Sequence, residues 1–231
     1  MREHPLLMQG PLVRATLEGR KTQTRRPIKP QPDDDIVDVE YDAIADLWLG
    51  NTQEDNDLGY TSSWAMRCPL GKAGDRLWVR ETFAIVHPCR DCEAGYVDDI
   101  KQPSVIPKDN AGGYWVPWYR SDWKGDDDTE RGFQWTPSIH MPRWASRIVL
   151  PLMSIRVERV QDITEEDAKA EGVEPVLMRG IGSYPEWMRP TMRGGHQKAF
   201  ELLWKQIYGD ALWDANPWVW VAEWDHVEVR K

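Results

Sequence analysis

Apolar residues recur at helical spacing in two stretches of the chain. Over residues 11–18 they predict a short helix that Pro11 begins and Gly19 ends. Over residues 196–208 the apolar side chains again share one face, and Gly209 follows as a stop signal. The face of the second helix is typical of a helix packed on a core, not of a ligand site.

A third helix is predicted from its first turn. Thr164 and Asp167 have the spacing of a capping box, with Asp in place of the usual Glu. The helix should run to about Glu171 and stop at Gly172. A carboxylate at that end opposes the helix dipole, so it calls for a nearby cation or a raised pKa. Both would suit a functional acid, and an ordinary exposed Glu is the alternative.

Alternation of apolar and polar residues predicts strands over Arg76–Glu81, 148–160 and 218–229, with a break at Pro151. The order of these helix and strand patterns predicts one compact α+β domain over residues 1–231. A doubly wound parallel sheet is not expected.

Three segments lack a clear period and are interpreted as long loop insertions: about 31–66, 86–135 and 173–195. Residues 31–66 hold ten acidic residues and no Lys or Arg, which indicates a largely irregular, solvated loop. The second segment is rich in Trp, and most of its aromatic side chains should pack onto the domain.

The chain has 231 residues and a net charge of −9, so the whole molecule should repel nucleic acid. Residues 1–30 are the exception, because they carry seven Lys and Arg against two Glu. We expect them to line the main cleft. The hydrophobic fraction of 41 % excludes a disordered chain, and no apolar run has the length of a signal peptide or membrane span. The expected location is cytoplasmic.

Cys89 and Cys92 form a Cys-x-x-Cys pair close to His87, which is half of a zinc motif. Cys68 or His140 would have to complete four ligands. The alternative is a pair of thiols in an insertion. We expect neither a metal nor another cofactor at the main site, and the two cysteines should not be essential to its activity.

The stretch from residue 17 to residue 26 combines four basic side chains with two hydroxyls. Lys21 and Thr24 suit a nucleophile with its activator, a phosphate-binding turn, or a plain basic turn. A shared site for Lys21 and Thr24 requires a turn or helical end, because strand residues three apart face opposite ways. The candidate substrate-binding residues are Arg20, Arg25, Arg26 and Arg120, the last beside aromatic residues that can stack a base.

Several motifs together resemble the ASCH domain family. Gly19-Arg20-Lys21-Thr22-x-Thr24-x-Arg26 resembles its first signature, and Gly74-Asp75-x-Leu77-x-Val79 its next strand. The longer blocks Gly74–Glu81, Pro137–Ile148 and Ala215–Trp220 resemble the larger ASCH proteins of tailed phages and prophages. The resemblance implies a PUA-like mixed β-barrel with flanking helices and long loop insertions.

The same resemblance implies a nucleoside- or RNA-directed protein. One bacterial branch is similar to an amidohydrolase that deacetylates acetylated cytidine, and its catalytic trio corresponds to Lys21, Thr24 and Glu171. The Trp-rich additions depart from that compact branch. Two other functions stay open. One is a non-catalytic module that binds RNA or a modified base, and the other is a phage interaction or inhibitor protein that uses its acidic segment. The sequence gives no oligomeric state.

Overall fold

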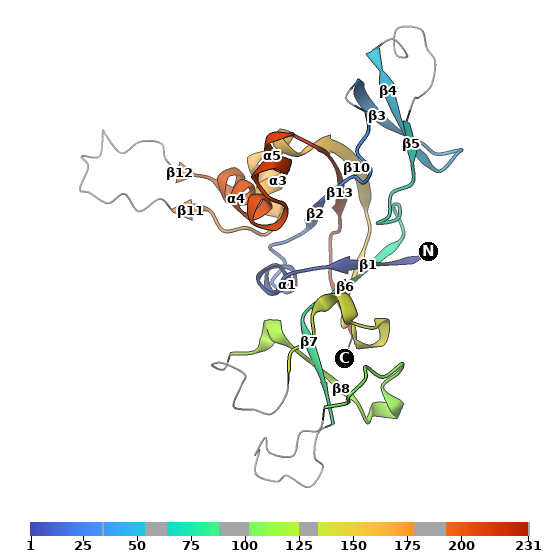
Figure 1. Cartoon of the computed structure of the whole chain (residues 1–231), viewed down its shortest axis with the longest axis vertical. Coiled ribbons are helices and arrows are strands. Elements are labelled where there is room, and N and C mark those ends of the chain that lie inside the picture. The colour runs from blue at the N-terminus through green and yellow to red at the C-terminus, as the bar shows by residue number, and fades with distance from the viewer. Residues whose placement is uncertain (34, 54–63, 88–101, 125–133, 178–192, 231) are drawn as a thin grey trace, which may run out of the picture.

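Two small sheets lie at the centre of the molecule (Figure 1). The computed structural model describes the chain except residues 34, 54–63, 88–101, 125–133, 178–192 and 231. The first sheet has the order β1-β6-β9-β14, formed by Glu3–Leu7, Arg76–Arg80, Ile148–Pro151 and Glu228–Val229. The second has the order β10-β13-β2, formed by Ser154–Arg159, Trp218–Glu223 and Gln23–Pro27. In these two sheets only β1 and β6 pair in parallel.

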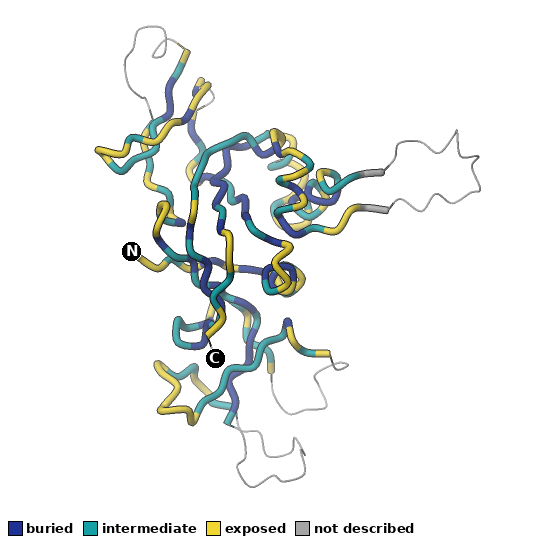
Figure 2. Tube along the Cα trace, turned by 180° about the vertical axis from the view of Figure 1, so that it is seen from behind, coloured by how far each residue is buried: buried dark blue, intermediate teal, exposed yellow. Residues whose placement is uncertain are grey.

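Strand β13 divides the core into two parts because its side chains alternate between the faces of its sheet. Trp218, Trp220 and Ala222 face the first sheet and pack with residues such as Leu77 and Leu150. Val219 and Val221 face the helices and pack with Phe200 and Trp204. Figure 2 shows the buried residues following these central strands.

The three predicted helices are confirmed. They are α1 over Gly10–Leu17, α3 over Glu165–Ala170 and α4 over His196–Tyr208. The capping box of α3 forms as expected, with the Thr164 side chain accepting from the backbone of Asp167. A further helix, α5 over Asp210–Asp214, was not predicted. Short 3₁₀ turns cover η2 Ala111–Gly113, η3 Arg120–Asp122, η5 Ser138–His140, η6 Arg143–Ala145 and η7 Val160–Asp162.

The prediction of an irregular acidic segment over residues 31–66 is wrong for its described part. This part forms a three-stranded antiparallel meander of β3 Ile36–Asp42, β4 Leu47–Thr52 and β5 Trp64–Met66. The centroids of the Trp48 and Trp64 rings lie 5.6 and 6.5 Å from that of Trp220 in the core. An antiparallel sheet needs only one buried face, so acidic residues on the other face do not prevent strand formation.

Where the second insertion was predicted, over residues 86–135, β8 Val116–Tyr119 pairs with β7 Phe83–Val86, which ends at the start of that segment. Within the predicted third segment, β11 Val176–Leu177 pairs with β12 Arg193–Gly194. The α+β class is therefore confirmed. Within the described ranges, the strands form separate open sheets and do not close into one barrel. In the same ranges, no helix combines the length and apolar character needed to cross a bilayer.

Candidate functional site

The basic stretch of residues 17–26 contains the turn between the end of α1 and the start of β2. Gly19 adopts a positive φ of 73° just after Glu18 caps α1. The backbone N–H groups of Arg20 and Lys21 then both donate to the Ala15 carbonyl, at 2.9 and 3.0 Å. This turn places Lys21 next to Glu171, the residue that follows the last turn of α3.

Lys21 and Glu171 form a buried ion pair between these two elements. Their backbones make an isolated antiparallel bridge, and Lys21 Nζ lies 2.7 Å from Glu171 Oε2. Lys21 Nζ also donates to the Gln23 carbonyl at 2.7 Å and to the Glu171 carbonyl at 3.0 Å. The two side chains are 1 % and 4 % exposed. The sequence prediction that Glu171 needs a nearby cation is thus met by Lys21.

Burial lowers the pKa of Lys21 below its ordinary value, and the nearby charges of Arg26 and Arg25 lower it further. The Glu171 carboxylate acts in the opposite direction. An ammonium has three N–H donors, and the three acceptors around Nζ match that number. In this conformation the acceptors stabilise the charged form, and all three donors are used.

Arg25 extends this pair into a network of carboxylates on the same face of the sheet. Its guanidinium is wholly buried and lies 2.8 Å from Glu158 Oε2, 3.2 Å from Asp167 Oδ2 and 3.6 Å from Glu171 Oε1. Arg156 pairs with Glu158 and Asp167 and carries the network towards the surface. Glu158 and Asp167 were not among the predicted site residues, although the strand alternation of residues 154–159 puts Arg156 and Glu158 on one face.

Thr24 lies in the regular part of β2, opposite Ala222 of β13. The turn or helical end that a shared site of Lys21 and Thr24 requires does not form, because Lys21 forms a β-bridge and β2 begins at Gln23. Strand alternation puts the Thr24 side chain on the face opposite Gln23 and Arg25. In the part of the chain that the structure describes, no hydrogen bond joins Thr24 to Lys21 or Glu171.

The other predicted binding residues lie apart from one another. Arg20 is 43 % exposed and pairs with Glu18 and Glu174. Arg26 donates to the Leu7 carbonyl and to the hydroxyl of Tyr208. Arg120 lines a hollow of about 880 Å³ between α1 and η3. Among the described residues, the basic side chains of the first 30 positions line separate hollows: Arg2 lines one, Arg14 and Arg20 a second and Lys21 a third, so these residues do not share one main cleft.

A hollow of about 310 Å³ opens beside Lys21. Its lining includes Leu17, Lys21, Thr22, Trp224 and His226. Lys21 Nζ lies 6.0 Å from the centroid of the Trp224 ring, within the range of a cation–π contact. This hollow combines the Thr22 hydroxyl and the exposed His226 ring with the buried Lys21, so it is the best candidate for the functional site.

The zinc hypothesis concerns residues that fall mostly outside the described ranges, since His87 is described but Cys89 and Cys92 are not. Over the described residues, no group of three or more His, Cys, Asp or Glu side chains is arranged to hold a metal. Cys68 is a free thiol, and burial raises its pKa to about 12. His140 is exposed in η5.

No protein-family model matches the chain, and neither a curated protein nor a solved structure shows significant similarity to it.

Proposed function

We propose that the chain is a nucleoside- or RNA-directed protein of the ASCH type, with a PUA-like fold, and that its ligand enters the hollow beside Lys21. The observation that carries this proposal is the buried Lys21–Glu171 pair, whose lysine lines the hollow. Lys21 belongs to the first signature that resembles ASCH domains, and Glu171 corresponds by position to the carboxylate of the family's helix. His226, whose side chain is 58 % exposed, gives the lining a ring on which a base can stack, and the hollow of about 310 Å³ suits one base better than a long strand.

The catalytic form of the proposal is removal of an acyl group from a modified cytidine. Thr24 Oγ would attack the acyl carbonyl carbon while Lys21 takes the hydroxyl proton. Cleavage of the C–N bond would release the amine, protonated through Glu171, and water would then hydrolyse the threonyl ester to a carboxylic acid. To act as a base, Lys21 would first have to lose a proton and break one of its three hydrogen bonds. The Thr24 side chain, which lies on the other face of β2, would also have to move next to Lys21.

The non-catalytic form is a module that binds a base or modified nucleoside without turnover. One observation favours it specifically. All three N–H donors of Lys21 Nζ are used by acceptors within the protein. These contacts are enough to explain why Lys21 is buried, without a role for it as a catalytic base. In this form the ion pair fixes the shape of the hollow, and Trp224 and His226 contact the ligand.

Incubation with acetylated cytidine, followed by detection of cytidine and acetate, tests the two forms. Thr24→Val keeps the side-chain shape and removes the hydroxyl, whereas Thr24→Ser keeps the hydroxyl. The catalytic form predicts turnover by the wild type and Thr24→Ser, and none by Thr24→Val. Lys108→Gln, an exposed position outside all the hollows described, serves as a control.

The binding form predicts no product from any variant and unchanged nucleoside affinity in Thr24→Val. It also predicts weaker affinity in His226→Ala, which removes the exposed ring of the lining, since base stacking contributes about 1–3 kcal/mol. Absence of both product and binding, for free nucleosides and for short RNA, would contradict the proposal.

A further inference from the structure

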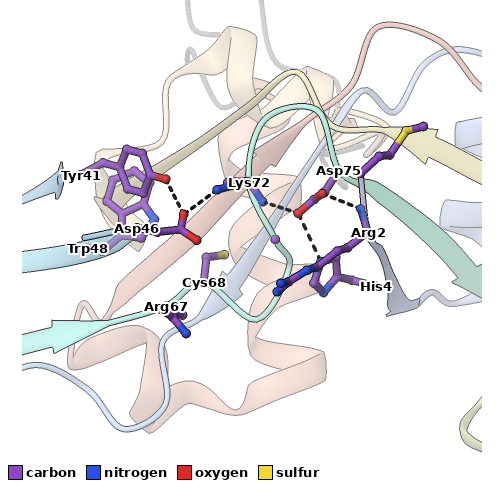
Figure 3. A pocket seen from close by; sticks show the side chains of 11 residues that line it. Arg2, His4, Tyr41, Asp46, Trp48, Arg67, Cys68, Lys72 and Asp75 are labelled. Atoms are coloured by element: carbon purple, nitrogen blue, oxygen red, sulfur yellow. Dashed lines mark hydrogen bonds and ion pairs between the residues drawn. The ribbon is translucent and has the colours of Figure 1, made fainter. Parts of the chain in front are cut away.

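A separate pocket of about 190 Å³ lies between the start of β1, the β3–β4 hairpin and the loop before β6 (Figure 3). It is on a different part of the molecule from Lys21 and shares no lining residue with that hollow. Three permanently charged basic side chains line it: Arg2, Arg67 and Lys72. The two carboxylates in the lining are Asp46 and Asp75.

Both carboxylates already have partners inside the protein. Asp46 accepts from the Tyr41 hydroxyl at 2.6 Å and from Lys72 Nζ at 3.0 Å. Asp75 accepts from the backbone N–H of Arg2 at 2.7 Å, and more weakly from that of Lys72 at 3.4 Å. Figure 3 shows Asp46 beside Tyr41 and Lys72, and Asp75 beside Arg2 and His4, with these contacts drawn as dashed lines. Lys72 therefore balances the charge of Asp46, and Asp75 is held by backbone donors and by His4 at 3.5 Å.

In the described part of the chain, the positive charges of Arg2 and Arg67 are not paired with a carboxylate in this way. Across the described residues, the side chains of Arg2 and Arg67 make no hydrogen bond and no ion pair. His4 Nε2 is buried and makes no hydrogen bond, and its nearest carboxylate oxygen, Asp75 Oδ2, lies 3.5 Å away. His4 therefore faces Asp75, and the guanidinium groups of Arg2 and Arg67 are the donors left for a polar ligand.

We propose that this pocket binds a phosphate group, held by the guanidinium groups of Arg2 and Arg67. Guanidinium groups present paired donors that fit the oxygens of a phosphate. The volume suits one such group, and Tyr41 and Trp48 form an adjacent aromatic wall. Two sources share this chemistry: a small phosphate compound and the backbone of single-stranded RNA. The site does not depend on the function proposed for the Lys21 hollow.

The test titrates the full chain with inorganic phosphate, and separately with a short oligouridylate, at constant ionic strength set by chloride. Binding is followed by calorimetry for the wild type, Arg2→Gln, Arg67→Gln and the double variant. Lys108→Gln is the matched control, because it removes the same charge from an exposed position outside the pocket. Both arginines are exposed, so their substitution should leave the fold intact, which thermal unfolding checks.

Saturable phosphate binding that weakens about tenfold or more in the double variant, and less than about twofold in Lys108→Gln, supports the site. If the oligonucleotide binds more tightly than inorganic phosphate and responds to the same variants, RNA is the source. If only inorganic phosphate binds, a small compound is the source. Two results overturn the proposal: no saturable binding of either probe, or binding that the double variant leaves unchanged.

Discussion

Lys21 and Glu171 are joined twice, by a backbone bridge and by a side-chain contact of 2.7 Å between Nζ and Oε2. The two residues are 150 positions apart in the sequence. The bridge ties the start of β2 to the end of α3, and the ion pair closes the contact in a buried environment. Burial makes each charge dependent on the other, because an unpaired charge in the interior is unfavourable.

Substitution of one member of the pair should therefore be costly. Lys21→Met and Glu171→Gln are each expected to lower the free energy of unfolding by about 3–5 kcal/mol. The double variant should lose less than the sum of the two, by about 0.5–3 kcal/mol, because neither charge is then left alone. Urea unfolding of the four proteins measures this difference. Strict additivity would show that the contact contributes nothing beyond its separate residues.

Gly172 should be sensitive to the smallest substitution. It has a φ of 77°, and a Cβ there would lie 2.6 Å from the Cβ of Lys21. Gly19 has a similar φ of 73°, but a Cβ there would meet no atom within 4 Å. Gly19→Ala should cost about 1–2 kcal/mol from backbone strain alone, and Gly172→Ala clearly more. Equal losses in chemical unfolding would contradict the close contact with Lys21.

The link between α3 and α4 should weaken in acid. Backbone N–H groups of His196 and Gln197 donate to the Glu165 carboxylate and hold its pKa at about 2, below the ordinary 4.5. A lowered folded-state pKa gives stability that is full above 4.5 and is lost as the pH falls towards 2.

Glu165→Ala should accordingly lower the melting temperature at pH 7, and the difference from the wild type should shrink between pH 4.5 and pH 2. Glu166→Ala is the matched control, because it removes an exposed neighbouring charge. A difference that is constant over this range would assign the effect to packing instead of the carboxylate.

A second buried acid depends on one arginine. Glu81 is 2 % exposed, accepts from the Ser121 hydroxyl at 2.5 Å and pairs with Arg147 at 3.1 Å. Burial raises the pKa of Glu81, and Arg147 opposes that rise. Arg147→Met should destabilise the fold by about 3–5 kcal/mol, because Glu81 loses its charged partner. Adding Glu81→Gln should recover part of the loss in the same urea assay, and no recovery would exclude the charge as the cause.

Three helices and their ends could be predicted from the sequence. Those of α1, α3 and α4 follow from local signals: Pro11 and Gly19, the box of Thr164 and Asp167, and the apolar face that Gly209 terminates. The strand β6 could also be predicted, because its single buried face imposes an alternation of apolar and polar residues. The strands β9 and β10 were predicted too, although β9 is buried almost throughout and β10 is half-buried along its whole length.

The ion-pair partners of the charged residues depend on the tertiary structure and could not be predicted from the sequence. Trp220 in the core gives the acidic segment a surface for a meander, which no pattern within residues 31–66 reveals. The pairing of β2 with β13 puts Thr24 and Arg25 on opposite faces, and the docking of α3 brings Glu171 to Lys21. These contacts join residues far apart in the chain, and local propensity carries no information about them.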